Sequence, residues 1–323
     1  MRLPDPVGYT AAEYEVFVEA SSPSMRVVIA GARGLVGTAL TESLVRDGHT
    51  VSRMVRPGET SRPGDVNWNP YAAIVDTPGL EGCDVVVNLS GAGIGDKRWT
   101  ANRKRVLRSS RIDTTRVLVE ALTHLKQKPA VFVSSSAVGF YGDRGDEVLV
   151  ESSGNGNDFL GILARSWEGE ANRAQIAGIR TVIMRYGIIL DKHRGALPLT
   201  VRPIRLGVGG RYGNGRQWVS WIALSDVVRV LRAAIDNATW RGPVNVATPN
   251  PVRNEDLVRT IASVLHRPAF LPAPAFALRL VLGEMADALL LASQRAKPDF
   301  LLNAGFSFQH EELQRALRDI LRG

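Results

Sequence analysis

Cysteine is nearly absent from this chain of 323 residues, which contains one, Cys83. One cysteine cannot form a disulfide within the chain, and this fits a reducing compartment. The five histidines are scattered without the spacing of metal ligands, so we expect no metal site. No apolar run approaches the roughly 20 residues that a membrane-spanning helix needs. These absences predict a cytoplasmic protein with neither a metal nor a membrane partner.

Residues 1–24 lack the pattern of a core segment. They contain three prolines and an acidic bias, without the basic and then apolar stretches of a secretory signal. We expect them to form an N-terminal extension.

The formal net charge of +8 invites comparison with proteins that bind nucleic acids. The basic residues are nevertheless spread along the chain beside acidic ones, and no recognition motif accompanies them. We therefore expect no nucleic-acid partner. The densest basic cluster, residues 97–111, follows a predicted strand. We expect Arg111 in this cluster to bind an anionic cofactor or substrate.

Strand and helix patterns alternate along most of the chain. The predicted strands are residues 27–30, 50–55, 66–68, 84–89, 130–133, 180–185 and 244–247. Such alternation predicts an α/β protein with a Rossmann-type, doubly wound parallel sheet. Helical patterns at residues 254–264, 275–291 and 311–321 predict a smaller, mostly helical C-terminal domain beside the substrate. We expect residues 25–187 and 218–250 to form the NAD(P)-binding domain, and residues 188–217 and 251–323 the substrate-side domain.

Three glycines at three-residue spacing, Gly31, Gly34 and Gly37, follow the first predicted strand and precede a helical pattern. Glycine allows a positive φ and lets a diphosphate approach the backbone N–H groups closely. The positive end of the helix, at Leu35 and Val36, favours the same anion. The pattern predicts a dinucleotide site. The alternative is a tight strand–helix turn without a ligand.

Arginines at two positions indicate which dinucleotide binds. Proteins that prefer NAD usually carry an acidic residue after the second strand, where it binds the ribose 2′-hydroxyl. This chain has Arg56 there and Arg33 inside the glycine loop, and guanidinium groups suit a 2′-phosphate. We therefore expect NADP(H), with NAD(H) less favoured. The alternative is that both are ordinary surface arginines.

Residues at the carboxyl ends of other predicted strands complete the expected cofactor site, because a cofactor lies across these ends in such a sheet. They are Leu89, Ser90, Gly91, Ser134, Ser135 and Tyr186.

Several spaced motifs, taken together, resemble one known family. They are Gly31-x-x-Gly34-x-x-Gly37, Asn88-Leu89-Ser90-Gly91, Arg98-Trp99-Thr100, Ser110-Arg111-Ile112-x-x-Thr115, Ser136-Ala137-Val138-Gly139-Phe140-Tyr141-Gly142, Trp167-Glu168, Gln217-Trp218-Val219-Ser220-Trp221 and Gly242-Pro243-Val244-Asn245. The chain resembles the extended short-chain dehydrogenases/reductases, and more narrowly their atypical epimerase-like subgroup of NAD(P)-dependent nucleotide-sugar epimerases, sometimes labelled cell-division inhibitors. The resemblance implies a Rossmann domain, a nicotinamide cofactor, an unsettled substrate and a C-terminal module of unassigned function.

Members of that superfamily share a catalytic Ser/Thr–Tyr–Lys set, in which Tyr and Lys lie four residues apart on one helix. In this chain no tyrosine has a lysine four residues later, and the helix expected at residues 158–168 offers apolar groups instead. Ser136 matches the serine of the set. By family analogy, Tyr141 is a loop residue near the substrate.

Two hypotheses remain. The first is an NADP(H)-dependent oxidoreductase or epimerase acting on an unidentified small molecule, in which Ser136 polarises the substrate oxygen and Tyr141 or a water handles the proton. The second is a non-catalytic NADP(H)-binding protein with a regulatory or redox-sensing role. The missing Tyr–Lys pair favours the second, whereas Ser136, the polar Gln217 and Trp221, and a full substrate-side domain favour the first. A homodimer is compatible with either.

Overall fold

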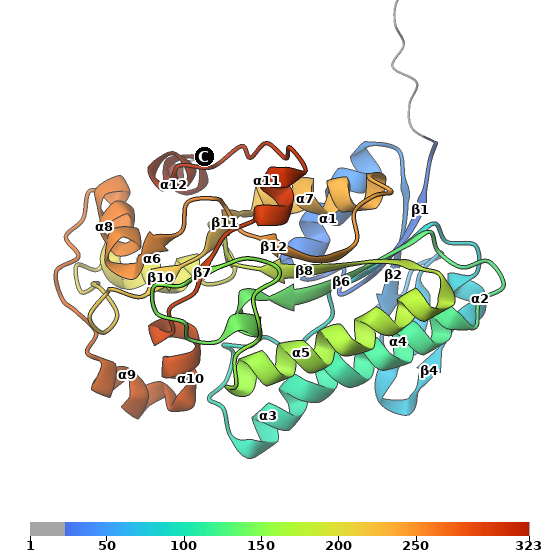
Figure 1. Cartoon of the computed structure of the whole chain (residues 1–323), viewed down its shortest axis with the longest axis horizontal. Helices are drawn as coiled ribbons and strands as arrows, with labels where there is room; N and C mark the ends of the chain where they lie inside the picture. Colours follow the sequence, from blue (N-terminus) through green and yellow to red (C-terminus); the bar gives the residue numbers. More distant parts are fainter. Residues whose placement is uncertain (1–22, 323) are drawn as a thin grey trace, which may run out of the picture.

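The computed structural model describes residues 23–322, and it has a central sheet covered by helices on both faces (Figure 1). The predicted extension, residues 1–24, lies almost wholly outside the described residues. Within the described range, no helix combines the length and apolar character needed to cross a membrane.

The central sheet has eight strands in the order β4-β3-β2-β1-β5-β6-β8-β12. These strands are β1 (Arg26–Ala30), β2 (Thr50–Val55), β3 (Val66–Asn69), β4 (Ile74–Val75), β5 (Val85–Asn88), β6 (Val131–Ala137), β8 (Arg180–Tyr186) and β12 (Gly242–Val246). All neighbouring pairs are parallel except β3 and β4. The chain runs outward from β1 through β2 and β3 and then returns to β5 on the other side of β1. This order confirms the predicted doubly wound sheet and places its switch point between β1 and β5.

Two helical layers bury the sheet (Figure 1). The helices α1 (Leu35–Arg46) and α7 (Leu224–Asp236) cover one face, and α4 (Thr114–Thr123) and α5 (Phe159–Asn172) cover the other, with α3 (Ala101–Arg108) below α5 and away from the sheet. In β1, Val27 and Ile29 join the core beneath α1 and α7, whereas Val28 and Ala30 join the opposite core. Because both faces are buried, the strands read as continuous apolar runs.

Shorter elements surround this framework. They are α2 (Thr77–Leu80), α6 (Leu197–Arg205), the π-helical segment Ser109–Asp113 between α3 and α4, and the 3-10 helices Pro70–Ala72, Val138–Tyr141 and Arg173–Ala177. Three strand pairs lie outside the main sheet: β7 (Val148–Leu149) with β14 (Arg295–Ala296), β9 (Ile188–Leu190) with β11 (Trp221–Ala223), and β10 (Trp218–Val219) with β13 (Val252–Arg253). The pairing of β7 with β14 ties the C-terminal region to the loop that follows β6.

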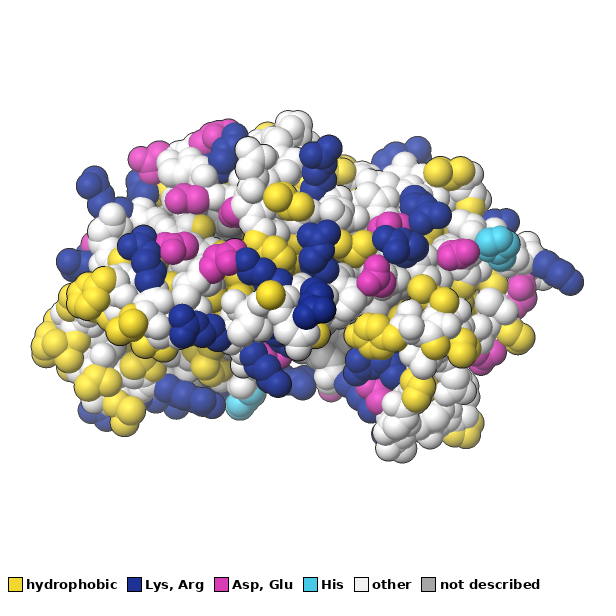
Figure 2. Space-filling model, turned by 90° about the horizontal axis from the view of Figure 1, so that it is seen from below, with side chains coloured by type: hydrophobic (Ala, Val, Ile, Leu, Met, Phe, Trp, Pro, Cys, Tyr) yellow, Lys and Arg dark blue, Asp and Glu magenta, His cyan; other side chains and the backbone are white. Residues whose placement is uncertain are grey.

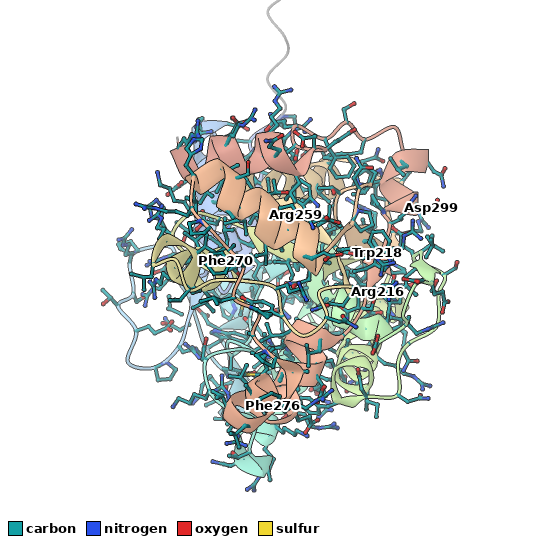
Figure 3. The ribbon with its side chains drawn as sticks, turned by 90° about the vertical axis from the view of Figure 1, so that its left-hand side faces the viewer. Arg216, Trp218, Arg259, Phe270, Phe276 and Asp299 are labelled. Carbon is teal, nitrogen blue, oxygen red and sulfur yellow. The ribbon has the colours of Figure 1, made fainter. Side chains whose placement is uncertain are left out.

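The C-terminal region is mostly helical, as the sequence predicts. Its helices are α8 (Asn254–Leu265), α9 (Ala275–Leu282), α10 (Glu284–Ala286), α11 (Asp299–Asn303) and α12 (Leu313–Arg322), with a π-helical segment at Asp287–Leu291. Figure 3 looks onto this region, with Arg259 of α8 in its upper half and Phe276 of α9 at the bottom. The single helical stretch expected at residues 275–291 is wrong, because Gly283 has a φ of +63° and ends α9.

Basic side chains do not gather in one patch on the face seen in Figure 2. Lys and Arg are scattered there among acidic side chains, and hydrophobic side chains gather at the left end.

The glycine loop generates a stability prediction. A Cβ at Gly37 would lie 2.7 Å from the Ala32 Cα, and only backbone surrounds that position. We expect Gly37→Ala to lower the free energy of unfolding by about 1–3 kcal/mol in urea denaturation, because α1 must shift. Gly169→Ala is the control, because Gly169 is an exposed position inside α5 with open space around it. Alanine there should raise the free energy of unfolding by up to about 1 kcal/mol. Equal effects of the two changes would contradict the close packing of α1.

Candidate functional site

The glycine loop joins β1 to α1 and packs against the end of β5. Gly31 has a φ of +81°, and a Cβ on it would lie 2.7 Å from the Leu89 carbonyl oxygen. Any other residue would therefore be strained and would push the two loops apart. Gly31 and Gly37 thus hold the loop against its neighbours.

The N-terminus of α1 opens toward the space above this loop. Gly34 is the N-cap residue, no side chain caps the helix, and its first turn has no acidic residue. The first backbone N–H groups of a helix have no partner within the helix, and they suit an anion. Leu35, Val36 and Gly37 supply these groups, in a place where no carboxylate of the first turn competes.

Two adjoining cavities run from the glycine loop in opposite directions. The larger has a volume of about 430 Å³ and reaches α5 and the C-terminal region, and the smaller, of about 370 Å³, lies over the end of β2. Both are lined by Gly31, Gly34 and residues 89–91. The result is one groove across the switch point between β1 and β5, where open α/β sheets bind their ligands.

Arginines surround the smaller cavity, but one glutamate accompanies them. Arg33 and Arg56 line it with Glu59. The Glu59 carboxylate is 2.8 Å from the Arg56 guanidinium and 4.0 Å from that of Arg33. Burial opposes ionisation of Glu59, but the hydrogen bonds and charge of Arg56 prevail and lower its pKa. The two arginines predicted to bind the 2′-phosphate therefore lie together, with one negative charge beside them.

Sequence reasoning missed Glu59, although a signal was present. Arg56-Pro57-Gly58-Glu59 contains a Pro-Gly pair, which is typical of a turn. Gly58 has a φ of +82°, and the Glu59 N–H donates to the Arg56 carbonyl at 3.0 Å. This turn brings the glutamate back beside the arginine.

Asn88 positions the loop at the end of β5. Its side-chain amide donates to the Thr115 hydroxyl at 2.9 Å, and its carbonyl oxygen accepts from the Ser90 N–H at 3.1 Å. The Trp167 indole also donates to the Thr115 hydroxyl, at 2.9 Å. These bonds link α4 and α5 to Leu89, Ser90 and Gly91, which line both cavities.

Ser136 lines the larger cavity and is tied to a buried ion pair. Its hydroxyl donates to Glu168 Oε1 at 2.6 Å. The Arg185 guanidinium holds the same carboxylate with two bonds of 2.8 Å. Since the Ser136 proton is used toward Glu168, the hydroxyl oxygen presents lone pairs to other groups.

The structure does not bring Tyr141 to the cavity. Its side chain is fully buried, and its hydroxyl accepts from Arg185 at 3.0 Å and donates to Asn245 Oδ1 at 2.7 Å. Burial raises the pKa of Tyr141, although Arg185 opposes the shift. Tyr141 thus extends the buried ion pair toward β12, behind the cavity wall.

The remaining strand-end residues differ in their positions. Ser135 and Tyr186 line the larger cavity, whereas Ser134 is fully buried away from it. Within the described residues, the hydroxyls of Ser134 and Tyr186 are buried without a hydrogen-bond partner. Burial raises the pKa of Tyr186, and the nearby Ser135 hydroxyl offsets part of that rise.

Gln217 and Trp221 serve packing. The Gln217 amide donates to the backbone oxygens of Tyr212 and Leu290, and Trp221 is fully buried. Neither lines the two cavities.

Arg111 enters the larger cavity from the π-helical segment between α3 and α4. Its guanidinium donates to the carbonyls of Ala92 at 3.0 Å and Leu107 at 3.3 Å, and its Cζ lies 5.4 Å from the centre of the Trp167 ring. Among the described residues, no carboxylate lies within ion-pair distance of it. Burial, with a smaller contribution from Arg103, lowers its pKa to about 10. Arg111 is therefore a cation without a protein counter-ion at the cavity wall.

The face of α5 toward the cavity carries neither tyrosine nor lysine. Leu160, Leu163, Ala164 and Trp167 line the cavity from this helix. Over residues 23–322, no three His, Cys, Asp or Glu side chains form a group that could hold a metal ion.

Comparisons with known proteins agree with this architecture. The model of the NAD dependent epimerase/dehydratase family matches residues 27–247, and that of a domain of unknown function (DUF1731) matches residues 273–320. The epimerase family protein ML0860 of Mycobacterium leprae is 40% identical over 90% of this chain and 94% of its own length.

Two solved structures are similar over 93% of this chain. The human epimerase family protein SDR39U1, solved with NADPH, has 31% identity and a TM-score of 0.84 and is covered completely. A nucleoside-diphosphate sugar epimerase from Corynebacterium glutamicum has 35% identity and a TM-score of 0.78, with 59% of that chain covered. The protein described here belongs to the NAD-dependent epimerase/dehydratase family and carries the domain of unknown function in its C-terminal region.

Proposed function

We propose that this protein is an NADP(H)-dependent oxidoreductase or epimerase that acts on a small molecule. The observation that carries the proposal is the groove over the switch point, with unpaired helix amides at its middle and two arginines at one end. A nicotinamide cofactor supplies hydride exchange at C4 of its ring when bound. The human relative solved with NADPH supports this choice of cofactor.

Each part of the groove suits one part of the cofactor. The amides of Leu35 and Val36 would hold the diphosphate, and Arg33 and Arg56 the 2′-phosphate. Residues 89–91, Ser135 and Tyr186 would adjoin the nicotinamide half, on the side of the larger cavity.

Ser136 has a narrower role than the family comparison implies. Because its proton goes to Glu168, its oxygen suits accepting a hydrogen bond from a substrate hydroxyl or from an amide N–H. Polarising a carbonyl would require that proton to turn away from a buried carboxylate. We therefore assign Ser136 as an acceptor and Tyr141 to the buried network.

A non-catalytic NADP(H)-binding protein is the second candidate. The apolar face of α5 favours it, because no side chain there can replace the tyrosine and lysine of the superfamily. A cavity of about 430 Å³ beyond the glycine loop favours the enzyme, since it exceeds the roughly 300 Å³ at which ligand pockets begin. Transfer of deuterium from C4-labelled NADPH to any product of a carbonyl panel would identify an enzyme.

Fluorescence titration of the purified chain with NADPH and NADH tests the cofactor assignment. We expect NADPH to bind more tightly than NADH. We expect Arg56→Gln to weaken NADPH binding by about 1–3 kcal/mol and to change NADH binding little. The control is Arg62→Gln, an exposed arginine outside the cavity lining. Equal losses for both nucleotides would contradict a contact with the 2′-phosphate.

Glu59 provides a second and independent test. Its carboxylate competes with a 2′-phosphate for Arg56, so Glu59→Gln should strengthen NADPH binding several-fold. If the change instead weakens NADH binding markedly and leaves NADPH binding unaffected, Glu59 binds a ribose hydroxyl and the site is specific for NAD(H).

Tyr141→Phe tests the structural role of the buried network. The change leaves Arg185 and Asn245 without a shared hydroxyl, so we expect the free energy of unfolding to fall by about 1–3 kcal/mol. NADPH affinity should stay within twofold of that of the wild type. A normal stability together with lost hydride transfer would show that Tyr141 takes part in the chemistry.

A further inference from the structure

The far wall of the larger cavity is apolar. Leu160, Leu163 and Trp167 of α5 line it on one side, and Ala288 and Leu289 of the C-terminal region line it on another. The cavity also has uncharged polar residues, and no Asp, Glu, Lys or His lines it in the described part of the chain; the uncharged polar residues are Ser90, Ser135, Ser136, Tyr186 and Gln294. A sugar ring carries several hydroxyls, and burying them without partners is unfavourable. The side chains of α5, Ala288 and Leu289 offer such hydroxyls no partner, so this wall suits an apolar group.

One charged side chain, Arg111, lines the same cavity. Its partners are two backbone carbonyls and the Ser110 hydroxyl, which do not neutralise a charge, and Arg103 is the nearby charge that affects it. Partly buried cations are normally matched by an anion. The indole of Trp167, which Thr115 holds in place, lies against the guanidinium and adds an apolar surface directly beside the charge.

The size of the cavity limits its ligand. About 430 Å³ must hold the nicotinamide half of the cofactor as well as any substrate. Pockets for a single ligand run from roughly 300 to 1,000 Å³. The volume left over for a substrate inside the cavity is therefore small.

We propose that the larger cavity takes a small organic acid, whose anionic group pairs with Arg111 and whose apolar part lies against α5 and residues 288 and 289. The domain of unknown function thereby contributes part of the apolar wall of the substrate site. This inference rests on the proposed function, because it assigns the remainder of the cavity to the cofactor.

The diphosphate of the cofactor is the competing anion for Arg111. The diphosphate has other hydrogen-bond donors, because the backbone N–H groups at the start of α1 have no side-chain cap and no acidic residue in the first turn. Leu35 and Val36, whose amides hold the diphosphate in the proposal, line the larger cavity together with Arg111. Because these amides already provide donors for the diphosphate, we assign Arg111 to the substrate, and its effect on NADPH affinity tests this choice.

The test is a binding experiment with the full-length protein saturated with NADPH. Ligand-observed NMR titrations would compare 4-phenylbutyrate, its uncharged amide 4-phenylbutanamide, and UDP-glucose. We expect the acid to bind at least ten-fold more tightly than the amide, and UDP-glucose to bind more weakly than the acid. In Arg111→Gln the preference for the acid should disappear, and Arg111→Lys should restore part of it. Arg108→Gln, an exposed arginine at the end of α3, is the matched control and should keep the preference.

The outcomes separate this inference from the proposed function. Equal binding of acid and amide, tighter binding of UDP-glucose, or a loss of NADPH affinity in Arg111→Gln without an effect on the acid would each overturn the inference while NADPH binding stands. Failure of the wild type to bind NADPH would overturn the proposed function. The binding of the acid and of the amide would then be compared on the cofactor-free protein. There the acid should still bind more tightly than the amide, and Arg111→Gln should still remove this preference.

Discussion

The close contact of the glycine loop with the end of β5 is the constraint on which the rest of this structure depends. Gly31 adopts a positive φ, and no Cβ fits between it and the Leu89 carbonyl. Gly37 lets α1 pack just as tightly against the loop. This packing opens the N-terminus of α1 onto the switch point and leaves space on both sides of it. The two cavities, and the chemistry proposed for each, follow from that geometry.

The fold follows from the sequence because its signals are local. Runs such as residues 85–87, apolar on both faces, are typical of a covered parallel sheet, and the glycine spacing identifies the first crossover. The C-terminal helices were also recognisable, but Gly283 interrupts the stretch at residues 275–291. The sequence does not reveal that interruption, because a glycine near the end of a helical pattern can either continue the helix or end it.

The site follows from the sequence only in part, because its polar contacts join distant residues. Glu168 and Arg185 lie on a helix and a strand, and no spacing rule predicts that they enclose the Ser136 hydroxyl. Tyr141 follows the matched serine closely in sequence and yet points away from the cavity into this network. Glu59, by contrast, was accessible to sequence reasoning through the Pro-Gly turn before it. Local turns are predictable, whereas partners brought together by packing are not.

The central claim is that the groove binds a 2′-phosphorylated dinucleotide across the switch point. A crystal structure of the protein grown with NADPH tests it most directly. The account predicts the diphosphate at the N-terminus of α1, the 2′-phosphate between Arg33 and Arg56, and the nicotinamide in the larger cavity. A nucleotide bound elsewhere, or an adenosine ribose held by Glu59 with its phosphate turned away from both arginines, would contradict it.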